Sequence, residues 1–527
     1  MTGIALMEHK LEVSGDTRTM SRRYLIMLLL LFVLAFGIRL AFLPIAPNNT
    51  TDAWSRFHEA QLWSSNPGVL PKETSEGAWL PLHFWLLGSV LWLTKSEMSL
   101  RVFTAFLGAL TVVFCWGIVR HAFDPTIALL SAVLLALFDF HIAFSITTGS
   151  EVPTIFFLAV GVYCWLRYTS EWTVPWVLLS AVMFSIACLC RFEAWLCAPV
   201  LTLMTVDTSR GWVAALSDRS RVNRALGFGL LASGGAFGWM LFSLLRWGDP
   251  LALLHRTAAD SHSVAAVLRH PVGFRLLMVP VSLATSLSPL ILILAGLGLS
   301  LVLVSPLRPA RSLGVLAMTL FAFNYYSSVH YETTQARYTL PYSWLLFPFA
   351  LEALRWLVAH WRRLNFPQAV GGMVIFFLLW QVGIVLGAEY ARPAIADRLA
   401  VMSPMIPLGH EMRDLVEWLQ NNRRSSTIIL DDFNRQSATI MRFAHLDPSK
   451  TFPIGRESVS DPARLQRDLD EFARARHPVL CVCSPYGPIG TTWSIRDAQD
   501  INVRSPAIHL RVLWRGKFWR VYSIADR

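Results

Sequence analysis

Long apolar runs alternate with short polar segments along the chain up to about residue 387. An α-helix needs about 20 apolar residues to cross a bilayer core of roughly 30 Å, and several runs approach that length. The pattern predicts spans at approximately 24–43, 99–119, 125–147, 151–168, 174–190, 191–205, 225–245, 275–304, 312–328, 339–359 and 368–387. We therefore expect an all-α polytopic membrane domain with about eleven transmembrane helices and additional interfacial helices.

The Trp-rich segment 79–94 could either cross the membrane or lie in its interface. Short loops with Lys and Arg normally face the cytoplasm. If 79–94 crossed, the basic loops that follow would face outward, whereas an interfacial helix puts them all inside. We therefore predict an interfacial helix. The outward polar segments are then 46–98, 147–151, 246–274 and 329–338, followed by the tail.

The composition changes after residue 388. The β-rich segments 426–433, 477–487 and 510–524 predict strands, and 409–422 and 462–476 have helical periodicity. The predicted domains are a cytoplasmic N-terminal tail (1–23), a transmembrane domain (24–387) with a first outer loop (46–98), and a small extracytoplasmic α/β domain (388–527).

The composition agrees with a membrane protein and argues against nucleic-acid binding and a zinc site. The chain is 54% hydrophobic and 15% charged, and its net charge is +11. Positive-inside loops explain that charge, so we expect no nucleic-acid partner. The seven Cys residues show no zinc-ligand spacing, and five of them lie in apolar runs.

The first candidate for chemistry is Asp52, in the sequence NNTTDAWSRFHEAQLW that follows the first span. This stretch can form a short amphipathic helix that holds the acid at the boundary between lipid and water. A fixed carboxylate there is suited to general-base chemistry on a hydroxyl acceptor. Arg56 and His58 could bind a phosphate. An isolated acid in this position is also commonly a solvated loop residue.

Glu151 is the second candidate, between two spans and just before Pro153. An acid at a helix N-terminus is favoured by the helix dipole, so Glu151 could be a cap. An ionisable group at membrane depth is also a functional candidate. The two interpretations are compatible.

Two further segments carry charges on the outer side. Arg191 and Glu193 could form a structural pair or bind a donor or acceptor. Arg337 and Tyr338 open a later helix, where Arg is either an interfacial anchor or a phosphate ligand. The loop 246–274 lacks paired metal-ligand spacing and is expected to be a polar loop that touches substrate. The acids of 431–433 follow a strand and are expected to form a polar turn.

The order of these features resembles the GT-C membrane glycosyltransferases. The features are an outward acid after the first span, the interfacial LPLHFW, the sequence SEVP, a late RYTLP and an outer α/β tail. The resemblance covers about 1–390 and points to the group that uses polyprenyl-phosphate sugars, including protein O-mannosyltransferases and lipid A aminoarabinose transferases.

The resemblance implies a transferase in the cell (inner) membrane with an extracytoplasmic acceptor and a polyprenyl-phosphate-linked sugar donor. Asp52 would activate the acceptor in an inverting displacement, Glu151 would orient it or hold a cation, and Arg337 would neutralise the leaving phosphate. The expected donor or substrate ligands are Arg337, Tyr338, Arg56, His58, Trp79, His83, Arg191 and Glu193. Asp52 and Glu151 could also bind a divalent cation, Mg or Mn.

Two other functions fit parts of the pattern. A flippase or transporter of a lipid-linked glycan would usually show repeated halves and broken midplane helices, and the sequence shows no clear repeat. A non-catalytic subunit of a glycan-assembly complex would not need Asp52.

Overall fold

The computed structural model describes most of the helical region and parts of the tail. It covers residues 22–44, 51–70, 79–171, 173–206, 218–258, 272–305, 308–331, 336–361, 365–390, 410–422, 426–431, 440–441, 444–447, 450–454, 479–484, 489, 495, 500–503, 508–516 and 519–526. The side chains of Asp52 and His58 are not among those described. Residues 1–21, most of the 388–409 linker and the predicted helix 462–476 also lie outside the described residues.

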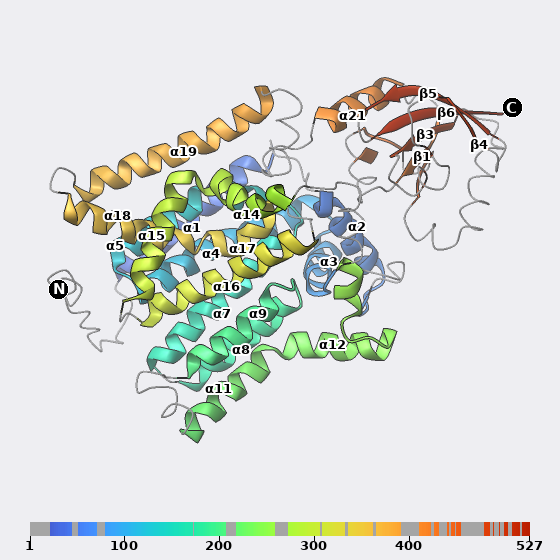
Figure 1. Ribbon diagram of the computed structural model, residues 1–527. Coiled ribbons are helices and arrows are strands. Elements are labelled where there is room, and N and C mark those ends of the chain that lie inside the picture. The colour runs from blue at the N-terminus through green and yellow to red at the C-terminus, as the bar shows by residue number, and fades with distance from the viewer. Residues whose placement is uncertain are drawn as a thin grey trace.

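The elements described between residues 22 and 390 are all helices (Figure 1). They are α1 (Arg22–Phe42), α2 (Thr51–Ser65), α3 (Leu82–Thr94), α4 (Glu97–Ala122), α5 (Pro125–Leu137), α6 (Asp139–Ser145), α7 (Glu151–Glu171), α8 (Val174–Cys188), α9 (Ala194–Thr205), α11 (Arg219–Ala232), α12 (Gly234–Trp247), α14 (Val272–Leu287), α15 (Pro289–Leu303), α16 (Arg308–Tyr331), the 3₁₀-helix η1 (Ala336–Thr339), α17 (Leu340–Ser343), α18 (Leu346–His360) and α19 (Phe366–Tyr390).

The predicted spans coincide with these helices. Among the described residues, four helices are long and apolar enough to cross a membrane alone, and seven if each bent pair counts as one span. The four are α1, α4, α7 and α19. The mostly helical fold is confirmed, whereas the number of eleven spans stays a prediction.

Three predicted spans are broken helices. The bends are 58° between α5 and α6, 52° between α11 and α12, and 109° between α14 and α15. The last break differs from the single span expected over 275–304. Ser288 there has a φ of 76°, and its hydroxyl caps α15 by accepting a hydrogen bond from Ile291 N at 3.3 Å. Pro289 favours a helix start, so Ser288 and Pro289 together begin a new helix.

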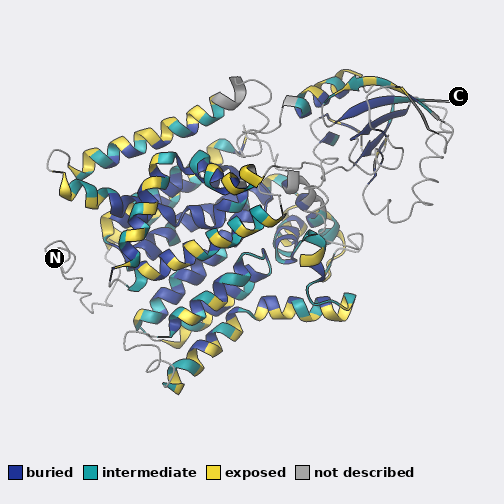
Figure 2. Ribbon diagram, in the orientation of Figure 1, coloured by how far each residue is buried: buried dark blue, intermediate teal, exposed yellow. Residues whose placement is uncertain are grey.

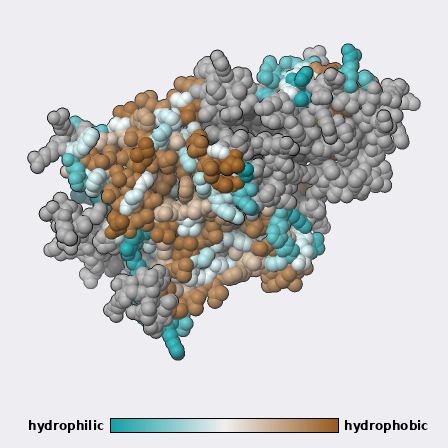
Figure 3. Space-filling model, viewed as in Figure 1, coloured by the Kyte–Doolittle hydropathy of each residue, from teal (hydrophilic) through white to brown (hydrophobic). Residues whose placement is uncertain are grey.

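The membrane domain has one continuous apolar core with an apolar exterior. The core extends from Leu31 of α1 to Phe377 of α19. Buried residues fill the centre of the bundle, whereas α12 and α19 carry many exposed residues (Figure 2). Large apolar side chains such as Leu245 and Ile293 are exposed, and hydrophobic residues predominate on the described part of the visible bundle face (Figure 3). Such a surface suits lipid, and with the helix lengths it makes the chain a multi-pass membrane protein.

The helices α2 and α3 pack against each other beside the bundle (Figure 1). Their shared apolar cluster includes Phe57 and Ala60 of α2 with Leu87 and Leu91 of α3. The 13 residues of α3 span about 20 Å, which is too short for a bilayer core. Because α9, with 12 residues, is equally short, the interfacial position of α3 stays a prediction.

The tail contains α21 (His410–Asn422) and one mixed sheet, with strand order β2-β1-β3-β6-β5-β4. The strands are β1 (Thr427–Asp431), β2 (Thr451–Ile454), β3 (Val479–Cys483), β4 (Ile501–Val503), β5 (Ile508–Arg515) and β6 (Arg520–Asp526). Strands β2, β1 and β3 are parallel, and the remaining pairs are antiparallel. Separate apolar clusters cover its two faces. The α/β fold predicted for the tail is confirmed.

Candidate functional site

Glu151 opens α7 directly after a tight turn formed by residues 146–150. The turn is held by its own side chains: Thr147 Oγ1 donates to Phe144 O at 3.1 Å and accepts from Gly149 N at 3.4 Å. The Glu151 carboxylate folds back over Gly149, where a Cβ atom would collide with it. A glycine at this position therefore lets Glu151, which is 1% exposed, lie against the turn.

Arg191 reaches Glu151 from the break between α8 and α9. Its Nη1 donates to Glu151 Oε1 at 2.9 Å, and its Nη2 and Nε donate to Glu193 Oε1 at 2.6 and 3.1 Å. Ser150 Oγ lies 3.5 Å from the same Nη1. One guanidinium thus joins the carboxylate at the start of α7 to the carboxylate just before α9.

Arg337 approaches the same carboxylate from η1. Its Nη1 lies 3.8 Å from Glu151 Oε1, which is an ion pair beyond hydrogen-bond distance. The ring of Tyr338 lies 5.5 Å from the Arg191 guanidinium and 5.3 Å from that of Arg337. Tyr338 therefore contributes a cation–π contact to both arginines.

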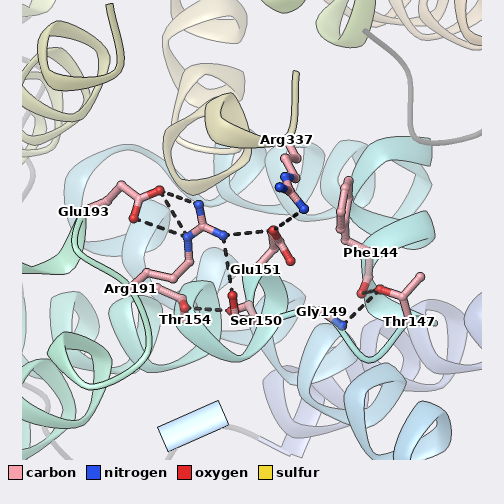
Figure 4. A network of polar contacts seen from close by, with 9 residues as sticks. All are labelled: Phe144, Thr147, Gly149, Ser150, Glu151, Thr154, Arg191, Glu193 and Arg337. Atoms are coloured by element: carbon pink, nitrogen blue, oxygen red, sulfur yellow. Dashed lines mark hydrogen bonds and ion pairs between the residues drawn. The ribbon is translucent and has the colours of Figure 1, made fainter. Parts of the chain in front are cut away.

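We call Glu151, Arg191, Glu193 and Arg337 the outer cluster (Figure 4). Its side chains are between 1% and 14% exposed. Removing either partner of a buried ion pair leaves an uncompensated charge, so the members depend on one another. The structure brings these four residues together, while their roles stay predictions.

A second polar group surrounds the start of α3. The guanidinium of Arg56 stacks over the ring of Trp79 at 4.5 Å, and Trp79 makes an edge contact with His83 at 6.0 Å. His83 Nδ1 lies 3.3 Å from Leu80 O. Arg56 and His83 are both buried, so α2 and α3 place a cation and an imidazole inside the protein.

Two contacts connect α2 and α3 to the outer cluster. Thr148 Oγ1 donates to the carbonyl of Ala53 in α2 at 2.5 Å. Leu82 N in α3 donates to Leu189 O, two residues before Arg191, at 3.0 Å. The two predicted sets of ligands are therefore neighbours.

Asp52 is the residue next to Ala53, in the first turn of α2. The contact between Ala53 and Thr148 thus brings the backbone beside Asp52 to the turn before Glu151. The side chains of Asp52 and His58 lie outside the described set, so their positions as base and phosphate ligand stay predictions.

The sequence interpretation missed several residues around the turn, above all Thr148, Gly149, Arg39 and His141. Arg39 and His141 were open to prediction, because each is an ionisable residue within an apolar run. Thr148 and Gly149 gave no such signal, since their contacts depend on the path of the turn.

The remaining predicted segments take no part in the outer cluster's contacts. In the outer loop after α12, Asp249 accepts from Leu251 N at 2.9 Å and pairs with His255 at 2.7 Å. These contacts hold the pKa of Asp249 below its usual value. Residues 259–271 of that loop lie outside the described residues. The pair is exposed, and any contact with substrate stays a prediction.

The described residues around Glu151 do not form a group of metal ligands. In the described parts of the chain, no three His, Cys, Asp or Glu residues are grouped as metal ligands. Two guanidinium groups flank Glu151 and disfavour a divalent cation at its carboxylate. A cation shared with Asp52 stays a prediction.

Comparisons with known proteins support the fold. Residues 76–217 match the family model for dolichyl-phosphate-mannose-protein mannosyltransferases. A comparison with curated protein sequences found no match. The crystal structure of ArnT from Cupriavidus metallidurans bound to undecaprenyl phosphate has a TM-score of 0.57 and 13% identity, covering 95% of this chain and 98% of that chain. The apo ArnT structure has a TM-score of 0.56 at 13% identity, covering 96% and 98%.

A third similar structure is the Archaeoglobus fulgidus oligosaccharyltransferase with a tethered acceptor peptide. It has a TM-score of 0.48 and 13% identity, covering 89% of this chain and 70% of that chain. At these identities the likeness to ArnT shows a shared fold. The resemblance to the GT-C glycosyltransferases is confirmed at the level of the fold, by the family model over residues 76–217 and by the fold shared with ArnT.

Proposed function

We propose that this protein transfers a sugar from a polyprenyl-phosphate donor to an extracytoplasmic acceptor, which is a glycan, a lipid or a protein. The observation that carries the proposal is the outer cluster, where Glu151 meets Arg191 and Arg337 beside α2. The fold shared with ArnT, whose structure was solved with undecaprenyl phosphate, supports a lipid-phosphate donor.

The phosphate of the donor would bind at Arg337. Arg191 is engaged with two carboxylates at 2.6 to 3.1 Å, whereas Arg337 lies 3.8 Å from Glu151. Arg337 therefore makes no hydrogen bond to Glu151 that a phosphate would have to replace. Arg also matches phosphate geometry with two parallel hydrogen bonds.

Asp52 would act as the general base. The acceptor hydroxyl gives its proton to the Asp52 carboxylate while its oxygen forms a bond to the anomeric carbon of the sugar. The bond from the anomeric carbon to the phosphate oxygen breaks on the opposite side, which inverts the configuration. The electron pair stays on the lipid phosphate, where Arg337 stabilises the added charge.

Glu151 would orient the acceptor and keep Arg191 and Arg337 in place. Arg56, His58, Trp79 and His83 would line the path from α2 and α3 to the reacting atoms. The outer cluster and the α/β tail would both face the extracytoplasmic side of the cell (inner) membrane. No step in this mechanism requires a divalent cation.

The experiment compares purified wild-type protein with Asp52→Asn. Sugar release from a panel of polyprenyl-phosphate hexoses and pentoses is measured with acceptor-containing envelope membranes. We expect turnover to fall about 100- to 10,000-fold, which is the usual contribution of a general base. Glu59→Gln is the matched control, because it makes the same acid-to-amide change in the same helix, and it should stay within threefold of wild type.

Full activity of Asp52→Asn would remove the base assignment. A wild-type protein that moves a lipid-linked glycan across vesicles without sugar transfer would instead favour the transporter. A chain that is needed in cells while Asp52→Asn supports normal growth would favour a non-catalytic subunit.

A further inference from the structure

A buried pair of basic residues, one from α1 and one from α6, lies next to the 146–150 turn. Arg39, near the end of α1, and His141, in α6, are both fully buried. Arg39 Nη2 lies 2.6 Å from His141 Nδ1, and Arg39 Nη1 donates to Ala35 O at 2.7 Å. Neither residue belongs to the outer cluster.

The chemistry of the pair fixes its protonation. A guanidinium carries donors only, so His141 Nδ1 must accept the hydrogen bond. The imidazole is therefore neutral, with its remaining proton on Nε2. Within the described part of the chain, Arg39 Nε and His141 Nε2 have no hydrogen-bond partner.

A buried arginine–histidine pair is an energetically unfavourable way to join two helices. The ion pairs found between described side chains do not include Arg39, so its buried charge is offset only by the carbonyl of Ala35 and the imidazole. Apolar residues of similar volume would usually be as stable or more stable at a buried position. A purely stabilising role is therefore a poor explanation for Arg39.

The position of the pair suggests what it does. Ser145, the last residue of α6, donates to His141 O at 2.5 Å. A Cβ atom on Gly108 of α4 would collide with Ser145 Oγ and come within contact of Arg39 Nε, so α4 packs directly on the pair. The next residue, Ile146, accepts a hydrogen bond at its carbonyl from Arg101 Nε at 2.7 Å. Helix α6 is thus held from α1 and α4 where the turn begins.

The turn contacts the segments that carry both predicted catalytic acids, Asp52 and Glu151. Thr148 contacts Ala53 beside Asp52, and Gly149 leaves the space that Glu151 occupies. A shift of α6 would move the Thr148 hydroxyl and the start of α7 together. The positions of Asp52 and Glu151 relative to each other would then change.

We infer that Arg39 and His141 are positioning residues, which hold the 146–150 turn so that Asp52 and Glu151 face the same acceptor. The inference rests on the proposed function for the two acids. Loss of the pair should lower turnover. It should change donor binding little, because the proposed phosphate ligand Arg337 lies on a different element.

The experiment compares His141→Leu with His141→Asn in the full-length protein. Leucine removes the acceptor of the Arg39 hydrogen bond, whereas the Oδ1 of asparagine can accept near the Nδ1 position. We expect His141→Leu to lower turnover about 10- to 100-fold, as misplacement by about 1 Å does, with the donor KM within threefold. His141→Asn should recover most of the turnover.

Thr205→Val is the matched control for stability. It removes another buried hydrogen bond between helices, from Trp165 Nε1 to Thr205 Oγ1 at 2.9 Å. Trp165 lies 14 residues along α7 from Glu151, or about 21 Å away. We expect a similar loss of thermal stability in Thr205→Val and unchanged turnover.

Amide hydrogen exchange at residues 146–150 gives a readout that needs no sugar transfer. Exchange there should speed up at least about tenfold in His141→Leu and stay unchanged in Thr205→Val. Unchanged exchange in His141→Leu would overturn the inference, and so would a turnover no lower than that of Thr205→Val. A wild-type protein that transfers no sugar would overturn the proposed function, while the exchange data would still decide whether the pair holds the turn.

Discussion

The outer cluster and the sheet edge in the tail, where β1 ends and β6 begins, both bury acids and arginines, but the contacts of these side chains differ. At the outer cluster, Glu151, Arg191 and Arg337 contact one another from three separate parts of the chain. In the tail, Asp431 at the end of β1 accepts from Ser484 N at 3.3 Å, and Arg520 donates to Trp519 O at 2.8 Å. These tail contacts are with backbone groups.

The neighbouring thiol supports the same distinction. Burial raises the pKa of Cys483 well above its usual value, with further contributions from Cys481 and Asp431, so the thiol stays protonated and unreactive. The contacts described at this sheet edge are structural ones. A buried acid is therefore a weak indicator of function, and its contacts with charged groups from distant elements are a stronger one.

The largest expected effect is that of Arg191→Met. The substitution leaves Glu151 and Glu193 buried without their shared partner, and breaking such a pair costs about 3–5 kcal/mol of stability. Thermal unfolding in detergent should show this loss. Arg167→Met removes a more exposed ion pair with Glu171 and should cost less than about 1 kcal/mol. Equal losses in the two variants would mean that the outer cluster is not electrostatically coupled.

Arg337→Gln should have a smaller effect, directed at the donor. A charged hydrogen bond contributes about 1.5–3 kcal/mol, so we expect the donor KM to rise about 10- to 100-fold. Steady-state kinetics with varied donor would measure this change. Tyr338→Phe, which keeps the aromatic ring, is the control and should stay within threefold. An unchanged KM in Arg337→Gln would move the phosphate site away from Arg337.

Asp431→Asn should have the smallest effect on activity. The amide weakens the hydrogen bond from Ser484 N, and we expect about 1–2 kcal/mol of lost stability with turnover changed less than twofold. Asp500→Asn is the control, because Asp500 is exposed and also accepts a backbone hydrogen bond, from Val512 N at 2.8 Å. A tenfold loss of turnover in Asp431→Asn alone would make the sheet edge a second functional site.

Much of the architecture followed from the pattern of apolar residues. Each predicted span falls on one or more of the described helices, and three of the spans are bent pairs. The break at Ser288 was not predicted, because hydropathy counts apolar residues and does not register a serine with a positive φ. Ser288 followed by Pro289 was a local signal that could have indicated it.

The sequence identified most residues of the candidate site, but it did not predict how they are arranged. Glu151, Arg191, Glu193, Arg337 and Tyr338 were each singled out, and the structure brings them together. The dependence of the turn on Arg39 and His141 was not foreseen, since these residues are 102 positions apart and each looks like an isolated polar residue in an apolar run.

The sequence by itself determined that the chain is a multi-pass membrane protein with an α/β tail, because helix and strand periodicity and the length of apolar runs are local properties. Tertiary structure alone decided that Arg191 lies between two carboxylates and that Thr148 ties α2 to the start of α7. Those contacts join residues 40 and 95 positions apart. They depend on how helices pack, and packing is set by the whole buried surface.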